Sequence, residues 1–160
     1  MATYKGRDIN TKPTEAMVRE AKRGLEWRKE FGRGGTEVGV ARARDISNRK
    51  ELSIDTMKRM YSFFSRHEVD KKAEGFRPGE EGYPSAGRIA WALWGGSAGF
   101  AVARRVRRQV EAADEAEEAA AVAEASASNA FAVTWLMVTF ALASPAPPVP
   151  RKIANVVSPD

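Results

Sequence analysis

The sequence predicts an all-α protein, a compact bundle of four to five short helices followed by a helical Ala/Glu extension and an apolar C-terminal tail. Three observations support this prediction. Apolar residues recur at helical spacing in successive stretches of residues 13–110. Ser or Thr residues, which cap helix N-termini, precede most of these stretches. No period-two alternation of apolar and polar residues, as a half-buried strand requires, stands out in the same range.

Charge is distributed unevenly along the chain. Residues 1–110 carry 24 Lys and Arg against 14 Asp and Glu, a net charge of +10, whereas residues 111–160 carry 2 against 7, a net charge of −5. A strongly basic domain is typical of proteins that meet an anionic partner. The sequence contains no cysteine, which excludes disulfides and thiolate metal sites. Its first residues lack the apolar core of a secretory signal.

Four parts are expected along the chain. The first is a flexible basic arm, whose cations either keep the chain soluble or follow a phosphate backbone. The second is the helical domain. The third is rich in Ala and Glu, which favour a helical spacer but bury little apolar area, and the fourth is an apolar, Pro-rich tail. The predicted bounds of these parts are residues 1–12, 13–110, 111–128 and 129–160.

Two helices are predicted before residue 51. Pro13 suits the first turn of the earlier helix, and the glycines between residues 32 and 35 end it. Thr36 is expected to open the later helix, which runs to Lys50. The predicted apolar faces are Met17, Val18, Ala21, Leu25 and Phe31 in the first helix and Val38, Ala41 and Ile46 in the second.

The next two predicted helices carry most of the aromatic residues. Ser53 is expected to cap the third, whose apolar face ends in aromatic rings. A long loop over residues 71–84 follows. Ser85 is expected to cap the fourth helix, which is apolar on nearly every side and should therefore be buried. Two glycines end it and allow a sharp turn, after which Ser97 caps an Arg-rich helix.

Three phrases of the sequence carry a resemblance to a known family. They are PTEAMVREAKRGLEWRKEFGRGGTEVGVARARDI, MKRMYSFFSRHEVDKK and GYPSAGRIAWALWGGSAGF, spread over residues 13–105. Together they resemble a small helical domain of unknown function that recurs in tailed-phage and prophage proteins, sometimes beside head-maturation (prohead) proteases. The resemblance implies a phage-derived protein that acts in virion (head) assembly, located in the host cytoplasm during assembly or in the virion.

Arginines on the predicted helices form the candidate nucleic-acid-binding set. Such charges make either a solvated face or, in a domain with a net charge of +10 over residues 1–110, contacts to phosphate groups. Arg33 lies in a glycine turn, which either places backbone N–H groups around an anion or simply separates two helices. The predicted set is Arg33, Arg42, Arg44, Arg49, Arg104, Arg105 and Arg108.

His67, the one histidine, stands beside Glu68 and Asp70, a grouping that invites a catalytic or metal-binding interpretation. Adjacent residues on a helix point about 100° apart, and no second histidine completes a common zinc site. The alternative is a helix C-terminus at which the carboxylates pair with nearby cations. The sequence therefore predicts a non-enzymatic protein with no catalytic residue, metal or cofactor; a hydrolase using His67 is the enzymatic alternative.

The tail offers a second candidate site. Residues 131–143 read FAVTWLMVTFALA, and an exposed apolar stretch of this kind rarely stays solvated in a monomer. We expect residues 129–144 to bind a protein partner or a second copy of the chain. A membrane span is an alternative, although about 20 apolar residues are needed and Ser and Asn interrupt the stretch; local packing is another. The predicted partner-binding residues are Phe131, Trp135, Leu136 and Phe140.

The sequence therefore supports two functional hypotheses. In the first, the chain is a binding and structural module that contributes to head assembly or contacts packaged nucleic acid non-specifically through a basic helical surface. In the second, it is a structural protein anchored by its apolar tail in a shell, a membrane or a neighbouring subunit. Strongly salt-dependent binding to nucleic acid distinguishes the first hypothesis from the second.

Overall fold

The computed structural model describes the backbone of residues 1–142 and the side chains of residues 1–129. The described part is mainly helical, as predicted, with a small two-stranded sheet. The chain divides into two compact units, Met1–Glu118 and Ala119–Asp160. The first unit contains the hydrophobic core and all the cavities described below.

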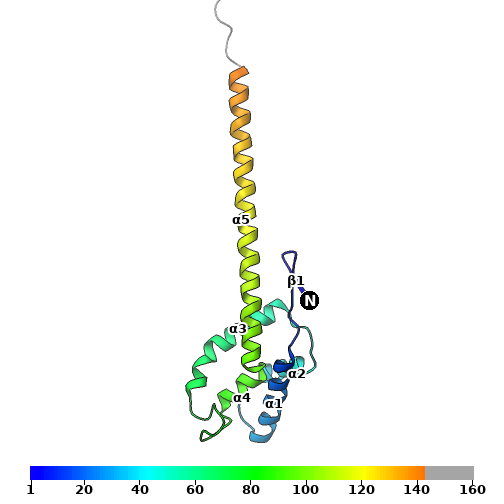
Figure 1. Ribbon diagram of the computed structural model, residues 1–160, viewed down its shortest axis with the longest axis vertical. Helices are drawn as coiled ribbons and strands as arrows, with labels where there is room; N and C mark the ends of the chain where they lie inside the picture. Colours follow the sequence, from blue (N-terminus) through cyan, green and yellow to red (C-terminus); the bar gives the residue numbers. More distant parts are fainter. Residues whose placement is uncertain (143–160) are drawn as a thin grey trace, which may run out of the picture. The chain divides into compact units, whose positions relative to one another are not determined.

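The helices of the first unit surround the beginning of one long helix. In Figure 1, α1, α2 and α4 lie together around the first turns of α5, and α3 crosses this helix. The elements in chain order are β1 (Ala2–Tyr4), β2 (Arg7–Ile9), α1 (Glu15–Phe31), α2 (Glu37–Ser47), α3 (Ile54–His67), the 3₁₀ helix η1 (Glu68–Lys72), α4 (Ala86–Leu93) and α5 (Gly96–Leu142).

Helices α1 to α4 each begin behind a hydroxyl side chain. Thr14, Thr36, Ser53 and Ser85 each accept a hydrogen bond from the backbone N–H three residues further on. Each bond satisfies one of the donors that a helix N-terminus leaves unpaired. The predicted helix starts at Thr36, Ser53 and Ser85 are therefore confirmed, whereas the first helix begins behind Thr14 and not at Pro13.

The prediction of a flexible arm over residues 1–12 is wrong. Strands β1 and β2 pair antiparallel, and Lys5 and Gly6 between them both have positive φ, 47° and 73°, as a two-residue hairpin turn requires. Each strand has three residues, too few for a period-two pattern to stand out. Ile9 and Thr11 are buried, so the segment belongs to the folded unit.

A polar network ties the hairpin turn to α5. The hydroxyl of Tyr4 donates to Oδ1 of Asp114 over 3.0 Å, and Nζ of Lys5 lies 2.7 Å from the same oxygen. Lys5 also pairs with Glu117. Hydrogen bonds from Lys5 and Tyr4 hold the pKa of Asp114 below its ordinary value, and the two carboxylates raise the pKa of Lys5. Lys5 is therefore engaged within the fold.

Aromatic rings fill the centre of the core. Trp91 is 2% exposed, and its ring centroid lies 4.7 Å from that of Phe64 and 5.9 Å from that of Phe100. The centroids of Phe64 and Phe100 are 5.3 Å apart, which closes a triangle between α3, α4 and α5. Trp94 stacks on Phe63 with a centroid distance of 4.6 Å. The prediction that Trp91 and Trp94 belong to the core is confirmed.

The apolar face predicted for the second helix is only partly right. Val38 is 62% exposed, because α2 turns its Gly39 side toward the core. A Cβ at Gly39 would lie 3.3 Å from Nε1 of Trp94. Because Gly39 has no side chain, this face of α2 can approach Trp94 closely, and it is the face that packs against the core. The predicted face was Val38, Ala41 and Ile46, and the observed one is Val40, Ala43 and Ile46.

Candidate nucleic-acid interface

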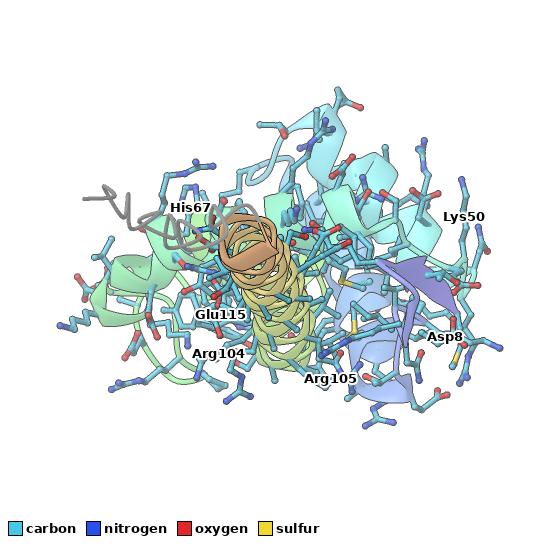
Figure 2. All side chains as sticks on the ribbon, turned by 90° about the horizontal axis from the view of Figure 1, so that it is seen from above. Asp8, Lys50, His67, Arg104, Arg105 and Glu115 are labelled. Carbon is cyan, nitrogen blue, oxygen red and sulfur yellow. The ribbon has the colours of Figure 1, made fainter. Side chains whose placement is uncertain are left out.

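The seven arginines predicted to bind nucleic acid have different surroundings. Three of them, which lie before, on and after α2, make contacts within the fold. In Figure 2, which looks along α5, Arg104 and Arg105 lie beside this helix, whereas Lys50, which follows α2, lies at the far right of the view. The internal partners are the carbonyls of Gly82 and Pro84 for Arg33, Asp45 for Arg42 and Glu15 for Arg49.

Of the other four arginines, one forms a hydrogen bond within the fold and three form no ion pair among the described residues. Arg105 donates to the carbonyl oxygen of Asn10 over 2.9 Å, which fastens the chain after the hairpin to α5. Arg44, Arg104 and Arg108 are exposed, and within the described residues they form no ion pair. These three are therefore the members of the predicted set whose charges remain available to a partner.

Arg104 belongs to a cluster of cations that the sequence analysis missed. Its guanidinium carbon lies 4.5 Å from the centroid of the Phe100 ring, and Nζ of Lys71 lies 5.9 Å from the same centroid. Lys71 also lies 4.3 Å from the Trp91 ring. The aromatic faces attract these cations, and so they bring η1 and α5 together although the two cations are far apart in the sequence.

A depression of about 500 Å³ extends from Lys71 along η1. The carboxylate of Glu68, the one acid that lines it, lies 3.9 Å from Lys71. Val69, 67% exposed, adds an apolar patch. On α5, Arg108 follows Arg104 by one helical turn. We name the five cations Lys71, Lys72, Arg77, Arg104 and Arg108 the basic surface.

His67 ends α3 and forms a pair with Asp70. Its Nδ1 lies 3.1 Å from Oδ2 of Asp70. The 3₁₀ turn of η1 brings these two side chains, which are three positions apart, onto the same side. The His67 ring also packs on Phe63, with a centroid distance of 4.5 Å. Glu68 faces Lys71 instead. Among the residues that the structure describes, no three or more His, Asp or Glu side chains gather as metal ligands would.

For the predicted partner-binding residues of the tail, the structure describes only the backbone, which belongs to α5. This helix continues to Leu142, but the side chains of Phe131, Trp135, Leu136 and Phe140 lie outside the described residues. From Glu115 to residue 129 every side chain is exposed. Within the part of the chain that is described, no helix combines the length and the apolar character that crossing a membrane demands.

No family model, curated protein or solved structure matches this chain. What the basic surface can bind therefore follows from the chemistry of its side chains. Three exposed or half-exposed cations and one carboxylate line the depression, and Arg104 and Arg108 add two exposed charges on α5. Lys and Arg donate charge-assisted hydrogen bonds to phosphate oxygens. Such a surface can follow the phosphate backbone of a nucleic acid, which gives affinity without reading the base sequence.

Proposed function

We propose that the chain is a non-enzymatic binding and structural module that holds nucleic acid by its phosphate backbone through the basic surface. The observation that carries the proposal is the placement of Lys71 and Arg104 at 5.9 Å and 4.5 Å from the ring of Phe100. Long cationic side chains lose rotamer freedom on binding. Packing against a buried ring restricts them beforehand, which lowers that cost.

Head assembly in a tailed phage is the setting that the sequence resemblance supplies for this proposal. A protein of the assembling head, made in the host cytoplasm and retained in the virion, meets packaged nucleic acid of every sequence. Binding through phosphate groups suits that setting, because it does not depend on the base sequence. The resemblance alone supports this biological context.

The proposal predicts steeply salt-dependent binding to a short labelled DNA duplex, measured by fluorescence anisotropy. Neutralising five phosphates gives a slope of about −4.5 for the logarithm of the association constant against the logarithm of salt concentration. The double variant Arg104→Gln/Arg108→Gln should reduce the magnitude of this slope by about two.

The matched control for this experiment is Lys22→Gln/Arg59→Gln. It removes the same charge from exposed positions on α1 and α3, outside the basic surface. We expect this variant to keep the slope of the unmodified chain to within one unit (~1). No detectable binding at about 50 mM salt, or an equal loss of slope in both double variants, contradicts the proposal.

Self-association is the second candidate function, and the exposed course of α5 favours it. Every residue from Glu115 to residue 129 is exposed, including Val122 at 65%. Helices in proteins gain most of their stability from packing an apolar face, and this segment packs against nothing among the described residues. We propose a second copy of the chain as its partner, joined through residues 129–144.

Truncation after Glu124 tests self-association. Multi-angle light scattering should give a multiple of the monomer mass for the full chain and the monomer mass for the truncated one, because the apolar segment is lost. DNA binding should be retained, since the basic surface precedes the cut. Equal association states of the two chains would refute this function. Retention of the full chain on lipid vesicles would instead favour the membrane anchoring that the sequence offered as an alternative.

A further inference from the structure

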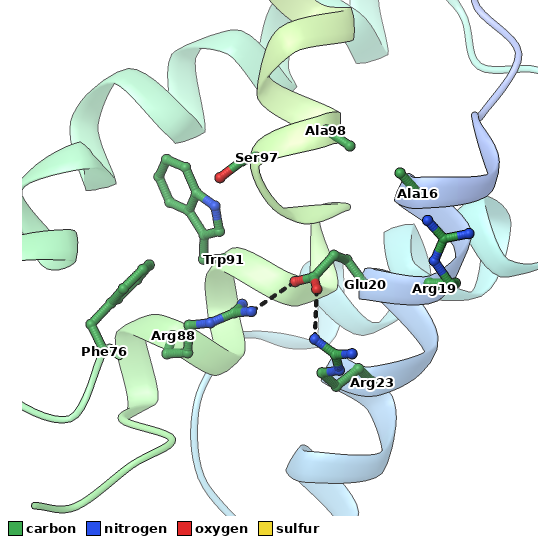
Figure 3. A pocket seen from close by; sticks show the side chains of 9 residues that line it. All are labelled: Ala16, Arg19, Glu20, Arg23, Phe76, Arg88, Trp91, Ser97 and Ala98. Atoms are coloured by element: carbon green, nitrogen blue, oxygen red, sulfur yellow. Dashed lines mark hydrogen bonds and ion pairs between the residues drawn. The ribbon is translucent and has the colours of Figure 1, made fainter. Parts of the chain in front are cut away.

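A cavity of about 290 Å³ lies between α1, α4 and the start of α5 (Figure 3). Three of its lining residues are arginines and one is a glutamate, so the charged side chains give a net charge of +2. Two aromatic rings form another part of the lining. The residues that matter here are Arg19, Glu20, Arg23, Phe76, Arg88 and Trp91, none of which belongs to the basic surface.

Glu20 holds two of the three arginines of the cavity. Its Oε1 lies 2.9 Å from Nη1 of Arg23, and its Oε2 lies 2.9 Å from Nη2 of Arg88. Figure 3 shows both contacts as dashed lines. Arg19 is exposed and has no ion pair within the described residues. One carboxylate therefore serves two guanidinium groups, and a third guanidinium group stands free at the edge.

Two buried donors in the lining have no hydrogen-bond partner among the described residues. They are Nη1 of Arg88 and Nε1 of Trp91. Trp91 is 2% exposed, and Figure 3 shows its indole nitrogen on the side of the ring that faces Ser97 and Glu20. A buried donor without an acceptor is costly and rare in native proteins. The cavity therefore offers hydrogen bonds that the fold itself does not use.

The first turn of α5 contributes further to the cavity, since Ser97 and Ala98 line it. Backbone N–H groups at a helix N-terminus have no intrahelical acceptor and carry partial positive charge. Gly96 lets α1 approach this turn closely, because a Cβ there would lie 2.7 Å from Cγ of Glu20. All these features favour an acceptor-only, negatively charged group.

We propose that this cavity binds a phosphate group. Its oxygens accept hydrogen bonds from Arg19, Arg88 and Trp91, and the start of α5 favours its charge. Glu20 competes with the phosphate for the arginines, so binding requires this carboxylate to move aside. Inorganic phosphate and the terminal phosphate of a nucleic-acid strand share this chemistry. Because the cavity and the basic surface share no residue, this proposal stands independently of the proposed function.

The test is a titration of the full chain with inorganic phosphate, with chloride at equal ionic strength as the reference. Two-dimensional ¹H–¹⁵N NMR follows the indole N–H signals of the tryptophans. We expect the Trp91 signal to shift more than that of Trp94, because only the Trp91 indole lines the cavity. Isothermal calorimetry then gives the affinity for each variant.

Three variants make the test specific. Arg19→Gln should weaken phosphate binding about tenfold, since it removes a charge-assisted hydrogen bond at an exposed position. Arg59→Gln, an equal change on α3, should leave the affinity unchanged. Glu20→Gln should strengthen binding because it removes the competing charge, whereas a purely structural role of Glu20 would predict weaker binding.

A 5′-phosphorylated oligonucleotide serves as the second probe. It distinguishes the two sources of the phosphate group, which are inorganic phosphate and a nucleic-acid strand. If inorganic phosphate and the oligonucleotide both shift the Trp91 signal, a free phosphate group suffices for binding. If the oligonucleotide alone does so, the cavity takes the phosphate of a strand. The proposal is overturned if neither probe shifts this signal, or if Arg19→Gln and Arg59→Gln bind both probes equally well.

Discussion

Trp91→Ala is expected to lower the free energy of unfolding of the helical domain by about 3–5 kcal/mol. The side chain is 2% exposed and its ring meets those of Phe64, Phe100 and Phe76 at near-perpendicular angles of 67°, 82° and 76°. Such edge-to-face pairs add to the stability that burial alone provides. Removal of the indole leaves a cavity at the point where α3, α4 and α5 meet.

Urea denaturation followed by circular dichroism measures this loss. Trp94→Ala should fall in the same range, because Trp94 is 9% exposed and stacks on Phe63. Trp27→Ala is the control for loss of an indole, since Trp27 is half-buried and should cost less. A loss below about 1 kcal/mol for Trp91→Ala would be typical of a surface residue and would contradict its place in the core.

The aromatic core could be predicted from the sequence because its signals are local. Each helix there has a hydroxyl cap, a fixed spacing of apolar residues or both, and these act within a few positions of one another. Gly95 and Gly96 were expected to form a sharp turn, and their φ angles of 95° and 65° confirm it. Local rules therefore sufficed for α3, α4 and the turn after α4. The cap predicted at Ser97 is wrong, because α5 already begins at Gly96.

The features that the sequence did not reveal depend on distant partners. Arg88 meets Glu20 across 68 positions, and Arg33 meets the carbonyl of Gly82 across 49. A count of charges cannot show which arginines make contacts within the fold. Arg33, which was predicted to bind nucleic acid, is an example, because it donates hydrogen bonds to the carbonyls of Gly82 and Pro84. Lys71 was counted as part of an exposed loop because its aromatic partner Phe100 lies in another helix.

Trp91 links the two candidate sites. Nζ of Lys71, from the basic surface, lies 4.3 Å from the indole ring, while the indole nitrogen faces the phosphate cavity (Figure 3). A substitution of Trp91 would therefore disturb the core and both sites together. For this reason the binding experiments use exposed residues such as Arg19, Arg104 and Arg108, whose loss leaves the core intact.

Gly24→Ala is expected to destabilise the domain by about 1–3 kcal/mol, as overpacking does. Helix propensity alone predicts the opposite, because Ala in a helix interior is favoured over Gly by about 1 kcal/mol. The contacts of the added Cβ decide whether the substitution raises or lowers the free energy of unfolding. A Cβ at Gly24 would lie 2.7 Å from the backbone nitrogen of Leu93 and 3.1 Å from Cβ of Ala92.

Backbone atoms of α4 cannot move aside as the end of a flexible side chain can, so α1 and α4 would have to separate and loosen the core. Urea denaturation of Gly24→Ala beside Gly39→Ala isolates this effect. At Gly39, in α2, the nearest atom to an added Cβ is Nε1 of Trp94 at 3.3 Å, a side-chain atom, so propensity should offset most of the strain. If Gly24→Ala is as stable as the unmodified chain, α1 and α4 do not cross as closely as the structure places them.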